Sequence, residues 1–137
     1  MSADEPALEI ALALCLRDGR LLVTRRKPDA HLGGFWEFPG GKRVLPETFT
    51  ACALRELAEE TGVQARAVRE REPIAWEYPE RRVLLHPVEC AWIAGEGELL
   101  EVADLRWVSG EELRALAFPP ANAALVQDLA ETLAPSA

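Results

Sequence analysis

The sequence predicts an α/β fold in which helices cover both faces of a mixed β-sheet. Segments typical of strands and segments typical of helices are interspersed along the chain. An early pair of strand-like segments is joined by the turn Asp18-Gly19, and such a hairpin excludes a purely parallel sheet. The 137 residues contain no internal repeat or linker-like segment. We therefore expect one domain over residues 1–137, large enough to bury its own core.

The first forty residues contain three of the expected strands. Residues 8–17 are apolar and typical of a buried strand, although their Ala and Leu content also permits a helix. Residues 20–26 form the return strand of the hairpin, and residues 27–34 form a loop marked by Pro and paired Gly. The aromatic segment 35–38 is a short strand that ends at a Pro-Gly-Gly turn.

An amphipathic helix is predicted between residues 48 and 62. Thr48 is a good N-cap, because its hydroxyl can accept a hydrogen bond from the first turn. Gly62 fits the position after the last turn, where left-handed backbone ends a helix. We expect a core-facing stripe well separated from an acidic face, and that stripe consists of Thr50, Ala53, Leu54 and Leu57.

Further strands are predicted in the middle of the chain. Segments 63–68 and 74–78 favour strands, and residues 78–81 form a turn. A long strand over residues 83–93 follows, and we expect an interruption near Pro87 because proline cannot donate to a sheet ladder.

The last third of the chain adds one strand and two helices. A glutamate-rich loop over residues 95–104 leads to a short strand at 105–108, and Ser109 caps a helix that reaches residue 116. A Phe-Pro-Pro break precedes a final helix over 122–133. Its apolar stripe consists of Leu125, Val126, Leu129 and Leu133.

Three glutamates on the first predicted helix are the main functional signal. Glu56, Glu59 and Glu60 stand at i, i+3 and i+4, so they share one helix face. Like charges at this spacing repel one another, and a hard divalent cation, which prefers oxygen ligands, would compensate them. The preceding run Gly40-Gly41-Lys42 lets the backbone approach a ligand closely. The pattern predicts a magnesium site.

Composition restricts the partners. The net charge of −8 argues against a nucleic acid polymer as ligand, but a small phosphorylated ligand can arrive with bound metal and meet local Arg and Lys. The three cysteines are too few and too far apart for a disulfide framework. The N-terminus lacks the basic start of a signal peptide, and no apolar run reaches the length of a membrane span. We expect a cytoplasmic protein with no membrane association and no obligatory protein partner.

Residues 41–63 match the Nudix box at every specified position. The box reads G, five residues, E, seven residues, R-E, an aliphatic residue, any residue, E-E, any residue, G and an aliphatic residue. Nine constrained positions at fixed spacing are far more specific than a lone glycine motif. The matching residues are Gly41, Glu47, Arg55, Glu56, Leu57, Glu59, Glu60, Gly62 and Val63. The chain therefore resembles the Nudix hydrolases, which implies an α/β/α sandwich with a mixed β-sheet.

The resemblance also implies a reaction. In the family, Mg²⁺ (with Mn²⁺ as the alternative ion) assists the attack of water on a polyphosphate. Glu56, Glu59 and Glu60 would bind the metal and carry the catalysis, and the carbonyl of Gly40 would be a further ligand. The position of Glu56 is also discussed as a base in the family. The sequence leaves open which carboxylate takes the proton.

Other charged residues have supporting roles by the same resemblance. Glu47 and Arg55 would pair as a structural brace, the alternative being two solvated charges. A fourth acidic ligand usually comes from outside the box. We assign it to Glu101, with Glu96 and Glu98 in the same loop as rivals.

A second resemblance, to the MutT branch of the family, covers most of the chain. It rests on the runs TRR (24–26), DAH (29–31) and EFPGGK (37–42) before the box, and on FPPAN (118–122) near the end. It implies nucleotide contacts from Arg26, His31, Phe38, Arg81 and Asn122. Lys42, like Arg26, is a natural phosphate or sugar contact.

Simpler interpretations exist for several of these residues. The amide of Asn122 both donates and accepts, so it suits a purine edge that presents both, and oxidised guanine has a donor at N7 where guanine has an acceptor. Alternatively, Asn122 only caps the last helix, Phe38 belongs to the core, and Arg26 and Lys42 are surface charges.

The expected activity is Mg²⁺-dependent hydrolysis of a nucleoside triphosphate, 8-oxo-dGTP, to the monophosphate and pyrophosphate. Two departures from the branch, at residues 33–36 and at His86-Pro87, leave another (d)NTP such as a cytidine nucleotide as the alternative substrate. A non-catalytic module that binds a modified base is the remaining alternative, but it would not need three glutamates together.

Overall fold

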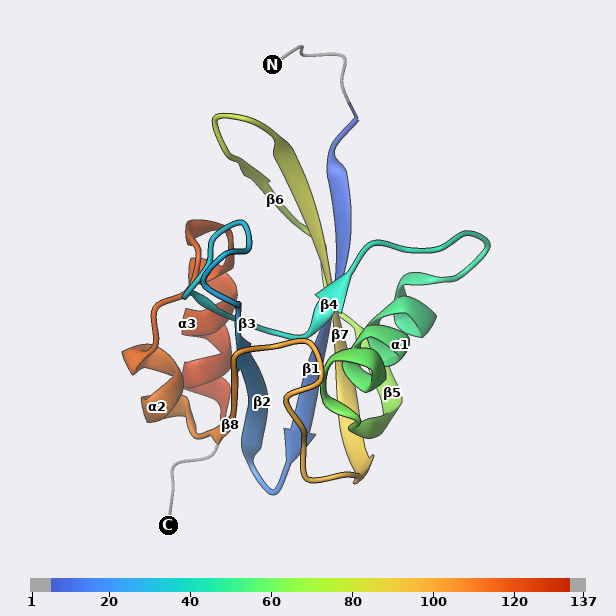
Figure 1. Cartoon of the computed structure of the whole chain (residues 1–137), viewed down its shortest axis with the longest axis vertical. Helices are drawn as coiled ribbons and strands as arrows, with labels where there is room; N and C mark the ends of the chain where they lie inside the picture. Colours follow the sequence, from blue (N-terminus) through green and yellow to red (C-terminus); the bar gives the residue numbers. More distant parts are fainter. Residues whose placement is uncertain (1–5, 134–137) are drawn as a thin grey trace.

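The computed structural model describes residues 6–133 (Figure 1). The strands are β1 (Leu8–Arg17), β2 (Arg20–Arg25), β3 (Trp36–Glu37), β4 (Gly40–Gly41), β5 (Gln64–Glu70), β6 (Ile74–Glu77), β7 (Arg82–Ala94) and β8 (Asp104–Val108). The helices are α1 (Phe49–Thr61), α2 (Gly110–Ala115) and α3 (Ala123–Thr132), the last preceded by a 3₁₀ turn, η1 (Pro120–Asn122). The elements lie close to the predicted ranges, and β4 is the one that the sequence analysis treated as a turn.

The strands form one mixed sheet that opens near its centre. Its order is β3-β2-β1-β7-β5, with β4 paired to β1, β6 to β7 and β8 to β2. The antiparallel strands β1 and β2 pair beside their hairpin turn and then diverge, while β1 runs parallel to β7. Residues 36–41, which we call the bridging segment, lie in the opening, with β3 on β2 and β4 on β1 (Figure 1). The glycines of the predicted site are therefore held between two halves of the sheet.

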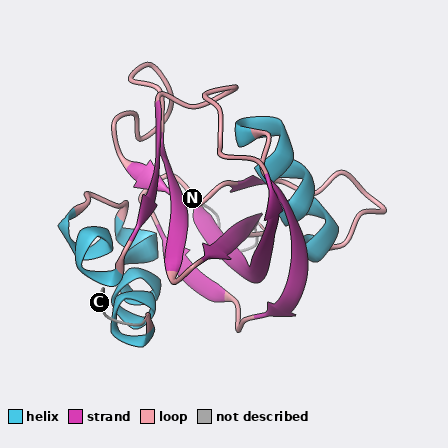
Figure 2. Cartoon of the chain, turned by 90° about the horizontal axis from the view of Figure 1, so that it is seen from below, coloured by secondary structure: helices cyan, strands magenta, loops and turns pink. Residues whose placement is uncertain are grey.

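Helices cover both faces of the sheet (Figure 2), which confirms the predicted α/β/α sandwich. On β1, Ala11, Ala13 and Cys15 pack in the cluster that contains the buried side chains of α1. Leu12 and Leu14 alternate with them and pack with the side chains of α2 and α3. Because the side chains toward α1 are small, this helix can approach the sheet closely.

Helix α1 begins and ends as predicted. The Thr48 side chain accepts a hydrogen bond from the amide of Ala51, and Gly62 has a left-handed φ of 73°. Both ends are therefore determined by local side-chain and backbone chemistry.

The predicted stripe of α1 was wrong in two respects. The hydroxyl of Thr50 donates to Glu70 at the end of β5 instead of entering the core, whereas Cys52 is fully buried. The acidic face is also not separate from the core, because Glu60 is only 7% exposed. Glu60 follows Leu57 by three residues and so lies on the same side of the helix.

Strand β7 runs through Pro87 without the predicted interruption. In a strand, the nitrogen and the carbonyl of one residue face the same neighbour, and the Pro87 carbonyl accepts from the Arg71 amide. On that side the partner strand changes from β6, which pairs as far as Leu85, to β5, which pairs from Val88. The N–H that Pro87 lacks would point into the gap between β6 and β5, where the sheet ladder requires no donor.

The C-terminal helices follow the prediction. Ser109 caps α2 and forms a capping box with Glu112, and Leu125 and Leu129 of α3 are buried in the core. No helix within residues 6–133 is long and apolar enough to cross a membrane.

Candidate active site

Two glycines of the bridging segment contact the acidic side chains of α1. The amide of Gly40 donates to Oε2 of Glu60 over 3.1 Å. A Cβ on Gly41 would lie 2.7 Å from the carboxyl carbon of Glu56, and a Cβ on Gly40 would lie 1.9 Å from the carbonyl oxygen of Ala11. Glycine is therefore required at position 40, where the neighbouring strand backbone approaches, whereas at position 41 a side chain would displace the Glu56 carboxylate.

These two contacts predict different effects of the same substitution. Gly40→Ala should lower the free energy of unfolding by about 1–3 kcal/mol or more, because the obstacle is backbone. Gly41→Ala should cost less stability, because the Glu56 side chain can rotate away, but a displaced carboxylate should lower kcat by on the order of 100-fold. Chemical denaturation and steady-state kinetics on both variants test this. Equal losses of stability and activity in the two variants would contradict it.

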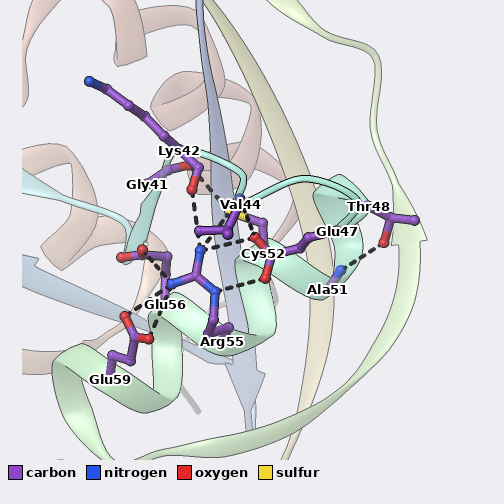
Figure 3. A network of polar contacts seen from close by, with 10 residues as sticks. All are labelled: Gly41, Lys42, Val44, Glu47, Thr48, Ala51, Cys52, Arg55, Glu56 and Glu59. Atoms are coloured by element: carbon purple, nitrogen blue, oxygen red, sulfur yellow. Dashed lines mark hydrogen bonds and ion pairs between the residues drawn. The ribbon is translucent and has the colours of Figure 1, made fainter.

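Arg55 holds three glutamates at once (Figure 3). It donates to both carboxylate oxygens of Glu47 over 2.7 and 3.0 Å, and its Nη1 donates to Glu56 over 3.0 Å and to Glu59 over 3.1 Å. These contacts lower the pKa of Glu47 to about 2, mainly through its hydrogen bonds with Arg55. The guanidinium also reaches the carbonyl of Lys42, whose side chain extends away from the network (Figure 3). Arg55 thus does more than pair with Glu47.

Glu60 is the most buried carboxylate of the group. Burial raises its pKa well above the ordinary value, and Glu37 and Glu56 raise it further, while the Gly40 amide acts in the opposite direction. The Glu37 carboxyl also has a raised pKa, mainly because it is buried, although Arg26 opposes the shift. Carboxylates this close in a buried site need a proton or a cation between them.

The donor chemistry of this group fits a hard divalent cation. Carboxylate and carbonyl oxygens are the ligands that Mg²⁺ and Mn²⁺ accept. As placed, no group of three or more His, Cys, Asp or Glu side chains among residues 6–133 converges in a metal-binding arrangement. The sequence analysis assigned the compensation of the three glutamates to a cation, and it missed Arg55, which relieves part of the repulsion between Glu56 and Glu59.

The loop before β8 brings Glu101 toward the same place. The amides of Leu100 and Glu101 both donate to the carbonyl of Glu60. Glu101, Glu60 and Glu37 line one hollow of about 410 Å³, which we call the acid hollow. Of the rivals, Glu96 forms an ion pair with Arg17, and the Glu98 carboxylate lies at the C-terminal end of α1 beside Gly62.

A larger cavity of about 480 Å³, which we call the apolar cavity, adjoins the acid hollow. Side chains of β1 and β7 such as Leu12 and Leu85 form much of its wall. Five of the six residues predicted to contact a nucleotide also line it: Arg26, His31, Phe38, Arg81 and Asn122. Lys42 lies outside both spaces and is exposed.

The sequence left open whether Asn122 caps the last helix or contacts a base, and whether Phe38 belongs to the core or contacts the nucleotide. Asn122 precedes α3 and is 8% exposed, but its side chain makes no capping hydrogen bond. Phe38 is fully buried with its ring 5.2 Å from that of Phe118, so it forms wall and core rather than a free stacking platform. Cys52, buried beside Gly41, has its pKa raised to about 11, chiefly by burial, and is a bystander.

Comparison with known families agrees with this geometry. The family model of the NUDIX domain matches residues 10–128, which include every residue named in this candidate site. The chain belongs to the Nudix family.

Two of its relatives among curated proteins are named for different nucleotides. The 8-oxo-dGTP diphosphatase of Escherichia coli K12 is 33% identical over 127 residues, which cover 89% of this chain and 95% of that protein. The CTP pyrophosphohydrolase of the same organism is 30% identical over 120 residues, covering 88% of this chain and 89% of that protein. The chain is a Nudix hydrolase of the MutT type, and these relatives speak against the non-catalytic alternative.

Solved structures share the Nudix fold. The MutT protein of Methanosarcina mazei Go1 superposes with a TM-score of 0.82 at 23% identity, covering 95% of this chain and 97% of that one. The ORF135 protein of E. coli gives a TM-score of 0.76 at 27% identity, with 94% of each chain covered. The predicted mixed sheet between helical layers is therefore the architecture of the family.

Glu37 is the site residue that the sequence analysis overlooked. It precedes the Nudix box by four residues and lines both the acid hollow and the apolar cavity. Its antiparallel partner is Thr24 of β2, whose buried hydroxyl has no hydrogen-bond partner among the described residues. The sequence does contain a signal for Glu37, namely an acidic residue inside a short aromatic strand. Burial of a carboxylate costs free energy unless a partner compensates it, so an acid at such a position suggests a functional role.

Proposed function

We propose that this Nudix hydrolase is a Mg²⁺-dependent nucleoside triphosphate pyrophosphohydrolase that prefers 8-oxo-dGTP and releases the monophosphate and pyrophosphate. The observation that best supports this proposal is that the apolar cavity and the acid hollow adjoin each other. The apolar cavity can take a base, and the adjoining acid hollow can take the phosphates with their metal. The 8-oxo-dGTP diphosphatase of E. coli matches along nearly its full length.

The acidic residues would hold the cation. Glu56, Glu59, Glu60 and Glu101, with the carbonyl of Gly40, offer the oxygen ligands for Mg²⁺, or for Mn²⁺ as the alternative. When bound, such an ion neutralises charge on phosphoryl oxygens and lowers the pKa of its bound water. Arg55 orients the Glu56 and Glu59 carboxylates beforehand, which lowers the cost of assembling the site.

The cationic residues of the apolar cavity would position the nucleotide. Arg26 lines both the apolar cavity and the acid hollow, so it can counter the phosphate charge that the net charge of the whole protein would repel. Arg81 lines only the apolar cavity and would contact the nucleotide there. Glu47 and Arg55 would support the site indirectly, because their ion pair holds the loop before α1 against that helix. Lys42, exposed outside both spaces, contributes through its backbone carbonyl, which accepts from Arg55.

Asn122 would read the base. Its amide is buried, lines the apolar cavity and caps no helix, so it is available to a purine edge that presents both a donor and an acceptor. Asn122→Ala should lower kcat/KM for the preferred nucleotide by roughly tenfold or more. Thermal stability should change little, because the Asn122 side chain makes no hydrogen bond to another residue within 6–133 that the substitution would remove. Gln127→Ala, which removes an exposed amide on α3, is the control and should leave kcat/KM unchanged.

A competition experiment tests the substrate. With Mg²⁺ present, kcat/KM is measured for 8-oxo-dGTP, dGTP, dCTP and CTP, and the products are identified. We expect 8-oxo-dGTP to lead and pyrophosphate to be released. A cytidine nucleotide is the second candidate, favoured by the match to the CTP pyrophosphohydrolase. If oxidised guanine has no advantage over dGTP, the proposed preference is wrong.

A further inference from the structure

A stack of side chains beside the start of α1 has no part in the function proposed so far. The guanidinium carbon of Arg43 lies 3.8 Å from the centre of the Phe49 ring, and the imidazole of His86 stacks on the same ring with centroids 3.6 Å apart. Two planar groups this close to one ring centre occupy its opposite faces, so Phe49 is enclosed between them. The Glu9 carboxylate contacts both outer layers, with Oε1 2.9 Å from Nε2 of His86 and Oε2 4.0 Å from Nη2 of Arg43. We call these four residues the Phe49 stack.

The Phe49 stack lies outside the two spaces of the candidate site. None of its four residues lines the apolar cavity or the acid hollow. Leu85 lines the apolar cavity, and His86 is on the opposite face of β7, because side chains alternate along a strand. His86, part of one departure from the MutT branch, therefore faces α1 rather than the cavity, and its role is not a contact with the base.

The stack joins the elements that surround the glycines of the bridging segment. Glu9 belongs to β1, His86 to β7, and Phe49 is the first residue of α1. Arg43 belongs to the loop 42–48, which joins β4 to α1 and extends away from the sheet before it returns (Figure 1). The side chain of Arg43 is only 31% exposed, although it comes from this protruding loop. The stack therefore fastens the loop to both the sheet and the helix.

Arg43 holds the end of the loop that is nearest to the glycines. Gly40 and Gly41 form the whole of β4, so their pairing with β1 extends over two residues only. The far end of the loop is held by Glu47 through its ion pair with α1. The carbonyl of Gly40 is a proposed ligand of the cation, and Gly41 leaves the space that the Glu56 carboxylate occupies. A loop that is free at its near end would let these glycines shift against the acids of α1.

We propose, on the basis of the proposed function, that Arg43 is a positioning residue: through the Phe49 stack it holds Gly40 and Gly41 against the carboxylates of α1, and it thereby sets the affinity of the site for its divalent cation. Residues that orient metal ligands without touching the ion typically change metal affinity or activity by roughly 10–100-fold.

The charge of Arg43 alone would have the opposite effect. Arg43 is a cation on the same loop as an acidic site, and like charges repel. Its removal would therefore strengthen the binding of a divalent cation if charge were the whole effect, whereas loss of positioning weakens it. The direction of the change distinguishes the two.

The test measures the binding of Mn²⁺ in the absence of nucleotide, from the electron paramagnetic resonance signal of the free ion. Arg43→Met keeps an unbranched side chain but removes the planar cation, and it should raise the dissociation constant of Mn²⁺ by roughly tenfold or more. Phe49→Leu keeps an apolar side chain but removes both ring faces, so it should act in the same direction. Phe49→Tyr keeps the ring and should retain the affinity of the unmodified protein. The Mg²⁺ concentration that gives half-maximal kcat should rise in parallel with the dissociation constant.

Another stacked arginine provides the control. The guanidinium of Arg106 lies 4.8 Å from the ring centre of Trp36 and 3.8 Å from the Asp104 carboxylate, on a side of the sheet where it holds no loop of the box. Arg106→Met should leave the dissociation constant of Mn²⁺ unchanged.

Two results with Arg43→Met would overturn the proposal. An unchanged dissociation constant with a lower free energy of unfolding would mean that the stack is structural only, and a lowered dissociation constant would mean that charge alone acts. A protein that binds no Mn²⁺ before any substitution would overturn it as well. If the unmodified protein binds Mn²⁺ but hydrolyses no nucleoside triphosphate, the proposed function fails, and the comparison of dissociation constants still decides the role of Arg43.

Discussion

Replacing Glu56 by Gln should lower kcat by at least about a hundredfold while the protein stays folded. The substitution keeps the size of the side chain beside Gly41 but removes the charge that would bind a cation or accept a proton. General acid–base contributions alone are worth about 10²–10⁴ in rate, and loss of a metal ligand adds to this. Steady-state release of pyrophosphate over a range of Mg²⁺ concentrations measures the effect.

A matched acid elsewhere provides the control for Glu56→Gln. Glu131 is an exposed glutamate on α3, far along the chain from the box. Glu131→Gln should leave kcat and the dependence on Mg²⁺ unchanged, and both variants should show the far-ultraviolet circular dichroism of the unmodified protein. If Glu56→Gln kept the full kcat, the proposed catalytic role of Glu56 would be wrong.

Replacing Arg55 should lower stability and activity together. Its forked guanidinium holds Glu47, Glu56 and Glu59, and only 30% of the side chain is exposed. Arg55→Lys keeps the charge but cannot reproduce this set of hydrogen bonds, so we expect a loss of about 2 kcal/mol in the free energy of unfolding. Arg55→Ala should cost about 3 kcal/mol or more, because three acids lose their partner. Denaturant titration and kcat on the same preparations check this.

An exposed arginine pair shows what a surface charge contributes. Arg20 donates to Glu112 with about half of each side chain exposed, so Arg20→Lys should change the free energy of unfolding by less than about 0.5 kcal/mol and leave kcat unchanged. If Arg55→Lys behaves like Arg20→Lys, the network around α1 has no structural importance.

The regular elements and the box could be read from the sequence because their signals are local. Thr48 and Gly62 delimit α1 through interactions within a few residues, and the hairpin turn at Asp18-Gly19 sets β1 against β2. The spacing of the box residues is also a local property. This is why the fold class, the helix that carries the glutamates and the family could all be predicted.

The rest depends on contacts between distant segments. Pro87 is tolerated because β5 and β6 happen to leave a gap opposite it. Glu60 is buried because the bridging segment and the loop before β8 close over the end of α1. The place of Glu37 between two spaces requires the opening of β1 from β2, which no single stretch of sequence specifies.

The most direct test of the account is a crystal structure with Mg²⁺ and a non-hydrolysable analogue of 8-oxo-dGTP. The account predicts the base in the apolar cavity against Asn122, and a cation between the phosphates and the carboxylates of Glu56 and Glu60. A nucleotide bound elsewhere, or those carboxylates directed into solvent with no ion between them and the phosphates, would contradict it.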